Sequence, residues 1–257
     1  MYQLKAYIKF LLNSQNQHGL HSPFVYDLVT QCFYDKKQYP EYELLNEFRQ
    51  GLLNNRETIQ VTDFGAGSKV FKTSERPVCG IAKNVGVSPT RAKFLFRLTN
   101  YLKCKTALEV GTSLGLGASA IAANKQTRLL SIEGCPETAN IARKQFEKFG
   151  LENIQLKIGE FSEVLDKDLT ADHKFDLVYF DGNHQKEPTL KYFQQLLPYA
   201  HNDSVFIFDD IHWSPGMEAA WEEIKAHPDV KVSIDTFYQG LIFFRKEQAK
   251  QHFRIRL

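Results

Sequence analysis

Two segments of the sequence end an apolar run on carboxylate and imidazole side chains. The segment "FDLVYFDGNH" places Asp181 directly after an apolar stretch, with His184 three residues later. The segment "SVFIFDDIHW" places Asp209 and Asp210 at the end of a second stretch, with His212 close behind. Both stretches have the length and composition of buried strands. Ligands of an open α/β sheet gather outside the carboxyl ends of its strands, so we expect these side chains to meet at one edge.

Three carboxylates at one edge repel one another unless a cation or basic groups neutralise them. Oxygen ligands without cysteine favour magnesium, manganese or calcium over zinc. We therefore predict a divalent-cation site formed by Asp181, Asp209 and Asp210, with the choice among these three ions left open. The alternative is structural, with Asp181 and Asp209 capping the helices that follow them.

A basic group beside these carboxylates could take part in proton transfer. An imidazole titrates near neutral pH, which makes His184 a candidate proton acceptor. His184 could equally be a further metal ligand, or a surface residue without a role. Lys186, two residues further on, is the second candidate base.

Two glycine-rich segments compete for the role of cofactor loop: "VTDFGAGSKVF", which contains Asp63, and "ALEVGTSLGLGAS", which contains Glu109. In a doubly wound sheet the first strand ends in a glycine turn that leads into a helix. An acidic residue then stands about twenty residues on, at the tip of the second strand. The second segment fits, because "GASAIAANK" supplies the helix and "RLLSIEG" ends an apolar run on Glu133.

The first glycine segment lacks this context. Pro77 and Gly80 are expected to break any helix after Asp63. We therefore predict that residues 63–68 form a turn in the N-terminal region, with a lid over a ligand as the alternative.

The order of apolar and helical segments predicts the fold class. From Thr106 onward, short apolar runs alternate with helical ones, which indicates a parallel sheet covered on both faces. The segments "VKVSIDTFYQ" and "GLIFFRK" are too close for a parallel crossover and must pair antiparallel. We predict a doubly wound α/β fold, Rossmann-like and mostly parallel, with seven strands, an antiparallel last strand and an N-terminal helical extension.

The first part of the chain is expected to be mainly helical. The N-terminal "MYQLKAYIKFLLNS" predicts an amphipathic helix with Leu4, Ile8, Leu11 and Leu12 on one face. Ser22 and Pro23 have the types of an N-cap and a first helical residue. We predict a helical cap region over residues 1–87, which covers the ligand pocket, and a cofactor-binding core over residues 88–257.

The composition excludes several classes of protein. The 257 residues carry a net charge of +2, which lacks the strong positive charge of a dedicated nucleic-acid binder. The four cysteines form no Cys-x-x-Cys pair, so we expect reduced thiols and a cytoplasmic protein. No run is long enough to span a bilayer, and we expect no secretory signal. The basic tail "FFRKEQAKQHFRIRL" is expected to be a solvated end.

The run from Thr106 to Lys246 resembles the class I S-adenosylmethionine-dependent methyltransferases, and among them the catechol-type O-methyltransferases. The segments that carry the resemblance are "LEVGTSLGLG", "LLSIEG", "LKIGEF", "FDLVYFDGNH", "FIFDDIHW" and "IDTFYQGLIFF". They cover a little over half of the chain, and the first hundred residues match only loosely.

The resemblance implies where S-adenosylmethionine would bind. Glu109, Gly111 and Ser113 would line its methionine end, Glu133 would bind the ribose hydroxyls, and residues 159–161 would border the adenine. The full cofactor-binding set consists of Glu109, Gly111, Thr112, Ser113, Gly115, Glu133, Gly134, Gly159, Glu160, Phe161 and Asp181.

The resemblance also implies the catalytic groups. In metal-dependent members, an aspartate matching Asp181 and an Asp-Asn pair matching Asp209 and Asp210 hold magnesium. The second member of that pair is an aspartate here, which makes the site one charge more negative. The family's base is a lysine at the position of His184.

These patterns together predict O-methylation of a small molecule, with divalent-metal assistance and a diol or catechol-like acceptor. A homodimer is possible, and neither nucleic acid nor membrane is expected as a partner. One alternative is a metal-dependent hydroxylase-like relative that uses His184, His212 and Asp209. Another is a non-catalytic cofactor-binding module on the same fold. An RNA methyltransferase is disfavoured by the nearly balanced charge.

Overall fold

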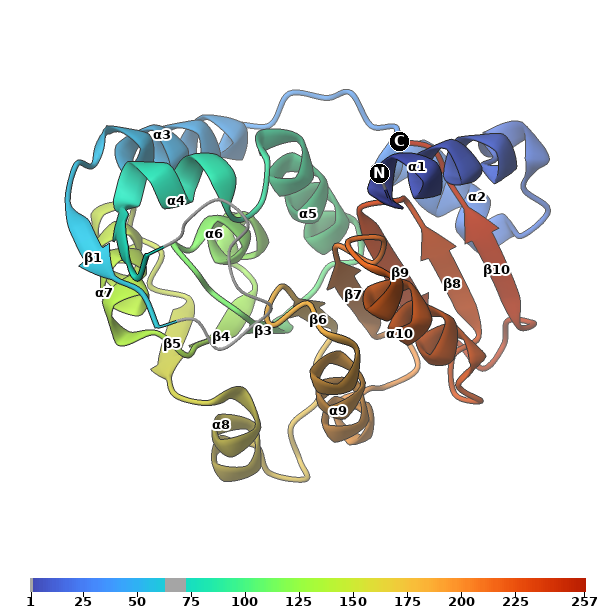
Figure 1. The fold of residues 1–257 in the computed structure, drawn as a ribbon. Coiled ribbons are helices and arrows are strands. Elements are labelled where there is room, and N and C mark those ends of the chain that lie inside the picture. Colours follow the sequence, from blue (N-terminus) through green and yellow to red (C-terminus); the bar gives the residue numbers. More distant parts are fainter. Residues whose placement is uncertain (1, 63–72) are drawn as a thin grey trace. The chain divides into compact units, whose positions relative to one another are not determined.

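The computed structural model describes residues 2–62 and 73–257, which form two compact units (Figure 1). The terminal unit contains residues 2–35 and 170–257. The central unit contains residues 36–62 and 73–169. The segment Asp63–Ser68, predicted as a turn or a lid, lies outside the described residues.

The central unit is built around three parallel strands in the order β3-β4-β5. A short antiparallel hairpin, β1-β2, stands apart from them. The strands are β1 (Thr58–Gln60), β2 (Glu75–Pro77), β3 (Thr106–Val110), β4 (Arg128–Glu133) and β5 (Ile154–Ile158). The helices are α3 (Glu41–Asn54), α4 (Val78–Asn84), α5 (Pro89–Tyr101), α6 (Leu116–Ala122), α7 (Pro136–Lys148) and α8 (Phe161–Asp168).

The terminal unit has five strands in the order β10-β8-β9-β7-β6. They are β6 (Leu177–Phe180), β7 (Val205–Asp209), β8 (Val232–Asp235), β9 (Gln239–Phe243) and β10 (Gln251–Arg254). Only β9 runs against its neighbours β7 and β8. The helices are α1 (Tyr2–Asn13), α2 (Pro23–Leu28), α9 (Lys186–Leu196) and α10 (Pro215–Ala226), with short helical turns η1 (Gln17–Gly19), η2 (Val29–Phe33) and η3 (Leu197–Tyr199).

The predicted fold class is confirmed, with one difference in the strand count. Parallel strands alternate with helices from β3 onward, and β9 supplies the predicted antiparallel pairing. The described residues of the two units contain eight such strands, β3 to β10, where the sequence predicted seven. The additional strand β10 comes from the basic tail, so the prediction of a solvated end is wrong. In β10 exposed His252 and Arg254 alternate with less exposed residues, as in an edge strand, and the buried Ile255 follows.

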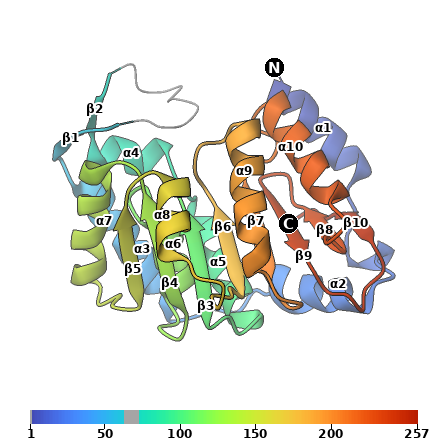
Figure 2. The same cartoon turned by 90° about the horizontal axis from the view of Figure 1, so that it is seen from below.

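Helices cover both faces of the terminal unit's strands. On one face, the ring of Trp221 in α10 packs against Gly240, and Phe193 in α9 packs against Phe206. Phe24 in α2 contacts Phe243 with ring centroids 5.1 Å apart. Residues 240 and 243 point to opposite faces because side chains alternate along a strand. Figure 2 shows α2 and α10 on opposite sides of β8 and β9.

Helix α1 lies at the edge of the terminal unit where β8 ends. Tyr7 and Phe10 place their rings 4.8 Å and 5.6 Å from the ring of Phe237, which follows β8. Phe10 is the buried residue of this helix, whereas Leu4 and Leu12 are 64% and 81% exposed. The predicted helix is therefore present, but the predicted apolar face is not the buried one. The role of residues 1–87 as a cap over a ligand pocket stays a prediction.

The predicted helix start at Ser22 is confirmed, and one predicted helix break is wrong. Ser22 and Ser88 are N-caps whose hydroxyls accept the backbone N–H groups of Val25 and Arg91. Gly80, expected to break a helix, lies inside α4, and Pro77 is the N-cap of this helix. A proline is tolerated there because the first N–H groups of a helix have no partner within it.

The part of the chain that the structure describes contains no helix both long and apolar enough to cross a membrane. No disulfide joins its four cysteines.

Candidate cofactor and catalytic site

Strained backbone gathers at the carboxyl ends of the strands. Seven described residues other than glycine have a positive φ angle, and five of them lie in turns that follow a strand. These are Ser113 after β3, Asn183 and His184 after β6, Asp210 after β7 and Phe237 after β8. Each such residue costs about 1–3 kcal/mol and persists only where its surroundings fix it, most often at functional sites. The carboxyl ends of the strands are therefore the candidate site in both units.

In the central unit, the glycine loop has the structure predicted for it. Gly111 and Thr112 both donate their N–H groups to the carbonyl of Ile132, at 2.9 Å and 3.1 Å. Gly115, with a φ of 85°, is the N-cap of α6. A Cβ atom at this position would lie 2.5 Å from the Phe146 ring, so only glycine fits. The strand, turn and helix follow one another as a nucleotide-binding loop requires.

Glu133 ends β4 directly beside this loop. Its Oε2 accepts the N–H of Ser113 at 2.7 Å, and its Oε1 accepts the N–H of Cys135 at 2.9 Å. The predicted ribose-binding carboxylate is thus fixed in orientation by two backbone donors.

The predicted adenine-bordering residues begin next to Glu133. The N–H of Gly159 donates to the carbonyl of Glu133 at 3.0 Å. Glu160 is the N-cap of α8, and its Oε2 accepts the N–H of Glu163 at 2.9 Å. The structure therefore brings Gly159 to the tip of β4, while the Glu160 carboxylate caps helix α8.

Glu109, in β3, is a buried acid two residues before Gly111 of the glycine loop. It is 1% exposed, and its Oε2 accepts the hydroxyl of Ser131 at 2.5 Å. Burial raises the pKa of Glu109 to about 8, the negative charge of Glu133 adds to this, and the Ser131 hydrogen bond opposes it. Burial thus favours the protonated form of Glu109.

In the terminal unit, the predicted carboxylates lie at neighbouring strand ends. Phe180 pairs with Phe208, so the next residues, Asp181 and Asp209, occupy adjacent register positions. Asp209 is buried, at 3% exposed. The imidazole Nε2 of His184 is 3.7 Å from Oδ1 of Asp181. The structure therefore places the candidate base beside the first aspartate.

The structural alternative for these aspartates is wrong. The N-cap of α9 is Gln185, and the N-cap of α10 is Ser214, whose hydroxyl accepts the N–H of Met217. Asp181 and Asp209 therefore do not cap the following helices.

The arrangement does not fit the predicted metal site. Among the described residues, no group of three or more His, Cys, Asp or Glu side chains could hold a metal ion. This covers the proposed set of Asp181, Asp209 and Asp210. The same finding applies to the hydroxylase-like set of His184, His212 and Asp209, because the His212 imidazole is hydrogen-bonded to Asp235.

Lys186, the second candidate base, is poorly suited to accept a proton. It is the first residue of α9, and its Nζ lies 2.5 Å from Oε1 of Glu223 in α10. The hydrogen bond to Glu223 raises the pKa of Lys186 and favours its protonated form. A protonated ammonium cannot accept a proton, so His184 is the better candidate.

A second histidine–aspartate pair lies at the same end of the strands. The Nε2 of His212 is 3.0 Å from Oδ2 of Asp235, which ends β8, and its ring stacks on Phe237. Its Nδ1 is 3.9 Å from Glu218, which also accepts the hydroxyl of Tyr2. Asp235 is not among the residues predicted from the sequence. Its pattern resembles that of Asp209, because "VSID" ends an apolar strand on an acid as "VFIFD" does.

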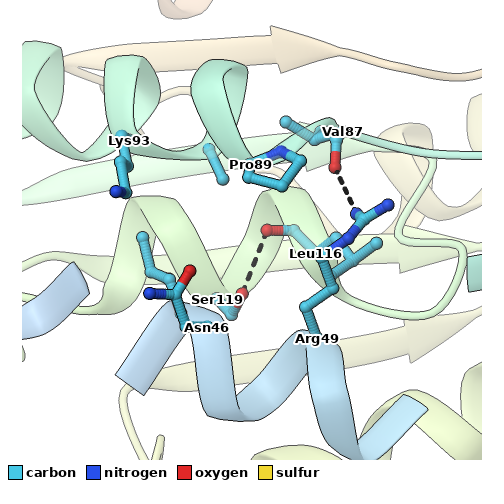
Figure 3. Close-up of a pocket in the computed structure, with 9 residues that line it drawn as sticks. Asn46, Arg49, Val87, Pro89, Lys93, Leu116 and Ser119 are labelled. Carbon is cyan, nitrogen blue, oxygen red and sulfur yellow. Dashed lines mark hydrogen bonds between the residues drawn. The ribbon is translucent and has the colours of Figure 1, made fainter. Parts of the chain in front are cut away.

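The central unit also contains a small cavity between α3, α5 and α6 (Figure 3). Arg49 reaches across it and donates to the carbonyl of Val87 at 3.0 Å. The cavity holds about 10 Å³, which is room for one water molecule. It is too small for a cofactor or an acceptor.

Comparison with known proteins agrees with this geometry. The sequence profile of a family described as "Methyltransferase domain" matches residues 108–211. This segment begins in β3 and ends just after β7, so it contains the glycine loop and the strand-end acids. Residues 108–211 are a methyltransferase domain. The predicted resemblance to the class I S-adenosylmethionine-dependent methyltransferases is thereby confirmed for this segment.

Relatives and solved structures resemble more of the chain than this domain. A catechol O-methyltransferase from Niastella koreensis is 29% identical over 131 residues, which cover 49% of this chain and 58% of that protein. The match thus spans less than two thirds of the relative's length. An SAH-bound methyltransferase from Podospora anserina has a TM-score of 0.61 at 15% identity, over 88% of this chain and 97% of that one.

A further structure is that of an O-methyltransferase from Streptomyces achromogenes in complex with SAM. It has a TM-score of 0.57 at 18% identity, over 90% of this chain and 99% of that one. At these identities the structures establish that the methyltransferase domain and its flanking segments share the methyltransferase fold.

Proposed function

We propose that this protein transfers the methyl group of S-adenosylmethionine to an oxygen atom of a small-molecule acceptor. The observation that carries the proposal is the Glu133 carboxylate, held by the N–H groups of Ser113 and Cys135 beside a glycine loop of a methyltransferase domain. The similarity to a catechol O-methyltransferase supports oxygen as the accepting atom.

The central unit would hold the cofactor. The two oxygens of Glu133 would accept hydrogen bonds from the ribose hydroxyls, since an acid at the tip of the second strand binds ribose in such folds. Gly111, Thr112, Ser113 and Gly115 form the loop that would approach the methionine part. Gly134, Gly159, Glu160 and Phe161 would border the adenine.

The terminal unit would supply the base. When bound, S-adenosylmethionine presents an electrophilic methyl group on a sulfonium sulfur, which departs as a neutral thioether. His184 would take the proton from the acceptor hydroxyl as the oxygen attacks the methyl carbon. Asp181, 3.7 Å from Nε2 of His184, would orient the ring and stabilise the imidazolium that forms. Much of the rate enhancement would come from holding the oxygen and methyl carbon in line.

No step in this proposal passes through a metal ion, because the described carboxylates do not form a metal-binding group. Hydroxylated aromatic compounds remain the first acceptors to test, because the curated relative is a catechol O-methyltransferase.

Two measurements test the proposal. Calorimetric titration with S-adenosylhomocysteine tests cofactor binding, and transfer of a labelled methyl group to catechols and simple phenols tests catalysis. We expect binding and O-methylated product. Absence of binding would refute the cofactor assignment, whereas binding without turnover on any acceptor would favour the non-catalytic module.

A further inference from the structure

A chain of hydroxyl groups ends on Glu109. Thr112 Oγ1 and Ser131 Oγ are 2.5 Å apart, and Ser131 Oγ is 2.5 Å from Oε2 of Glu109. A serine hydroxyl has a single hydrogen to donate. When Glu109 is ionised, Ser131 donates to it and Thr112 donates to Ser131. Oε2 of Glu109 is therefore the terminal acceptor of this chain.

The second oxygen of the same carboxyl group is buried and has no hydrogen-bond partner within the described part of the protein. Leaving a buried charged oxygen unpaired is costly, and protonation of the carboxyl lowers this cost because it removes the charge. The charged group that acts on Glu109 is Glu133, at the tip of the adjacent strand, and its charge is of the same sign. Burial and this like charge both favour the neutral acid, and they agree with a pKa raised to about 8.

We propose that Glu109 selects the positively charged cofactor: it is a neutral acid in the unliganded protein and gives up its proton to solvent when S-adenosylmethionine binds. This inference rests on the proposed function. S-adenosylmethionine carries a sulfonium and an ammonium charge, and a cation near a buried carboxyl favours its ionised form. The unpartnered oxygen then becomes an acceptor for the ligand. S-adenosylhomocysteine lacks the sulfonium charge, so it releases fewer protons.

The proposal makes cofactor binding dependent on pH. Wherever binding releases one proton, the dissociation constant changes by up to about tenfold per pH unit. Binding of S-adenosylmethionine therefore strengthens as the pH rises toward 8, and it levels off once unliganded Glu109 is already ionised. Release of S-adenosylhomocysteine becomes easier, because its neutral thioether no longer favours the ionised form of Glu109.

Calorimetry on the full chain tests this. Titrations with S-adenosylmethionine at neutral pH, in buffers of different ionisation enthalpy, give the number of protons released. We expect a release approaching one proton for the wild type, a smaller release for S-adenosylhomocysteine, and none for Glu109→Gln. Glu147→Gln, an exposed glutamate on α7, is the matched control and should behave as the wild type.

Ser131→Ala keeps the test informative if Glu109→Gln does not fold. Removing the hydroxyl that stabilises the carboxylate should move the pH dependence of binding to higher pH. Binding without proton release, or equal release with both ligands, would overturn the inference while leaving the proposed function intact. Failure to bind S-adenosylmethionine at any pH would instead refute the proposed function.

Discussion

The backbone N–H of Ser113 lies 2.7 Å from Oε2 of Glu133, although twenty residues separate them in the chain. This hydrogen bond joins the turn after β3 to the tip of β4. The other oxygen of Glu133 accepts the N–H of Cys135, so one carboxylate fixes both sides of the loop. The orientation of the Glu133 carboxylate is therefore fixed before any ligand binds.

Replacing Glu133 by alanine should weaken cofactor binding without unfolding the protein. The loss of a charged hydrogen-bond acceptor corresponds to about 1.5–3 kcal/mol of binding free energy. Calorimetry with S-adenosylhomocysteine measures the change. Glu137→Ala, an exposed acid in the first turn of α7, is the control and should bind normally. Equal affinity in both variants would show that Glu133 is not the ribose ligand.

His184→Ala should lower turnover while leaving cofactor affinity unchanged. Loss of a general base typically reduces the rate by about 10²–10⁴-fold. The matched control is His201→Ala. His201 also pairs with an aspartate, Asp176, but these two residues precede β7 and β6, whereas His184 and Asp181 follow β6. Methyl transfer to the best acceptor is measured for both. A similar loss in both variants would mean that His184 acts only through stability.

Much of the fold was predictable because it follows from local patterns. Alternation of apolar runs and helical segments predicted the parallel strands, and the small separation of β8 and β9 predicted their antiparallel pairing. The choice between two glycine segments was also local, since only one is followed by a helix and by an acid at the next strand tip. Glu133 and its loop could be found for this reason.

The errors concern residues whose environment is set by distant parts of the chain. Phe10 is buried because it meets Phe237, which lies in the turn between β8 and β9, and helical periodicity in α1 does not reveal that partner. Three acids at strand ends looked like a metal site. Their positions along the sequence are as predicted, but the direction of each side chain depends on turns such as the one at Asp210, with its φ of 53°.

Chelation of divalent cations should leave methyl transfer unchanged. The described carboxylates form no metal-binding group, and the proposed base is an imidazole. Turnover is measured after treatment with a chelator and again after magnesium is added back. Loss of turnover that magnesium restores would show that Asp181, Asp209 and Asp210 rearrange around a cation.

Gly240→Ala should destabilise the terminal unit. A Cβ atom at this position of β9 would lie 2.7–2.9 Å from the ring of Trp221, which is fully buried and cannot move aside. Overpacking of this kind costs about 1–3 kcal/mol of unfolding free energy. Gly216→Ala is the matched control, because its nearest neighbours would be at 3.7 Å and alanine favours the helix α10. Urea unfolding distinguishes the two, and equal midpoints would contradict the packing argument.

The buried acid Glu109 should make the unliganded protein less stable as the pH rises. The pKa of Glu109 is raised from 4.5 to about 8 in the folded state, chiefly by burial. Between these values the folded protein binds the proton that the unfolded chain has lost. Its contribution to stability is therefore complete below pH 4.5 and is lost as the pH rises through 8.

The slope is at most about 1.4 kcal/mol of unfolding free energy per pH unit. Glu109→Gln resembles the neutral acid at every pH, so the difference in stability between this variant and the wild type should grow from acidic to alkaline pH. Denaturant unfolding at several pH values measures it, with Glu147→Gln as the control for loss of an exposed charge. A difference that stays constant across this range would show that Glu109 is already ionised in the folded protein, and that its buried oxygen is stabilised by a group not yet recognised.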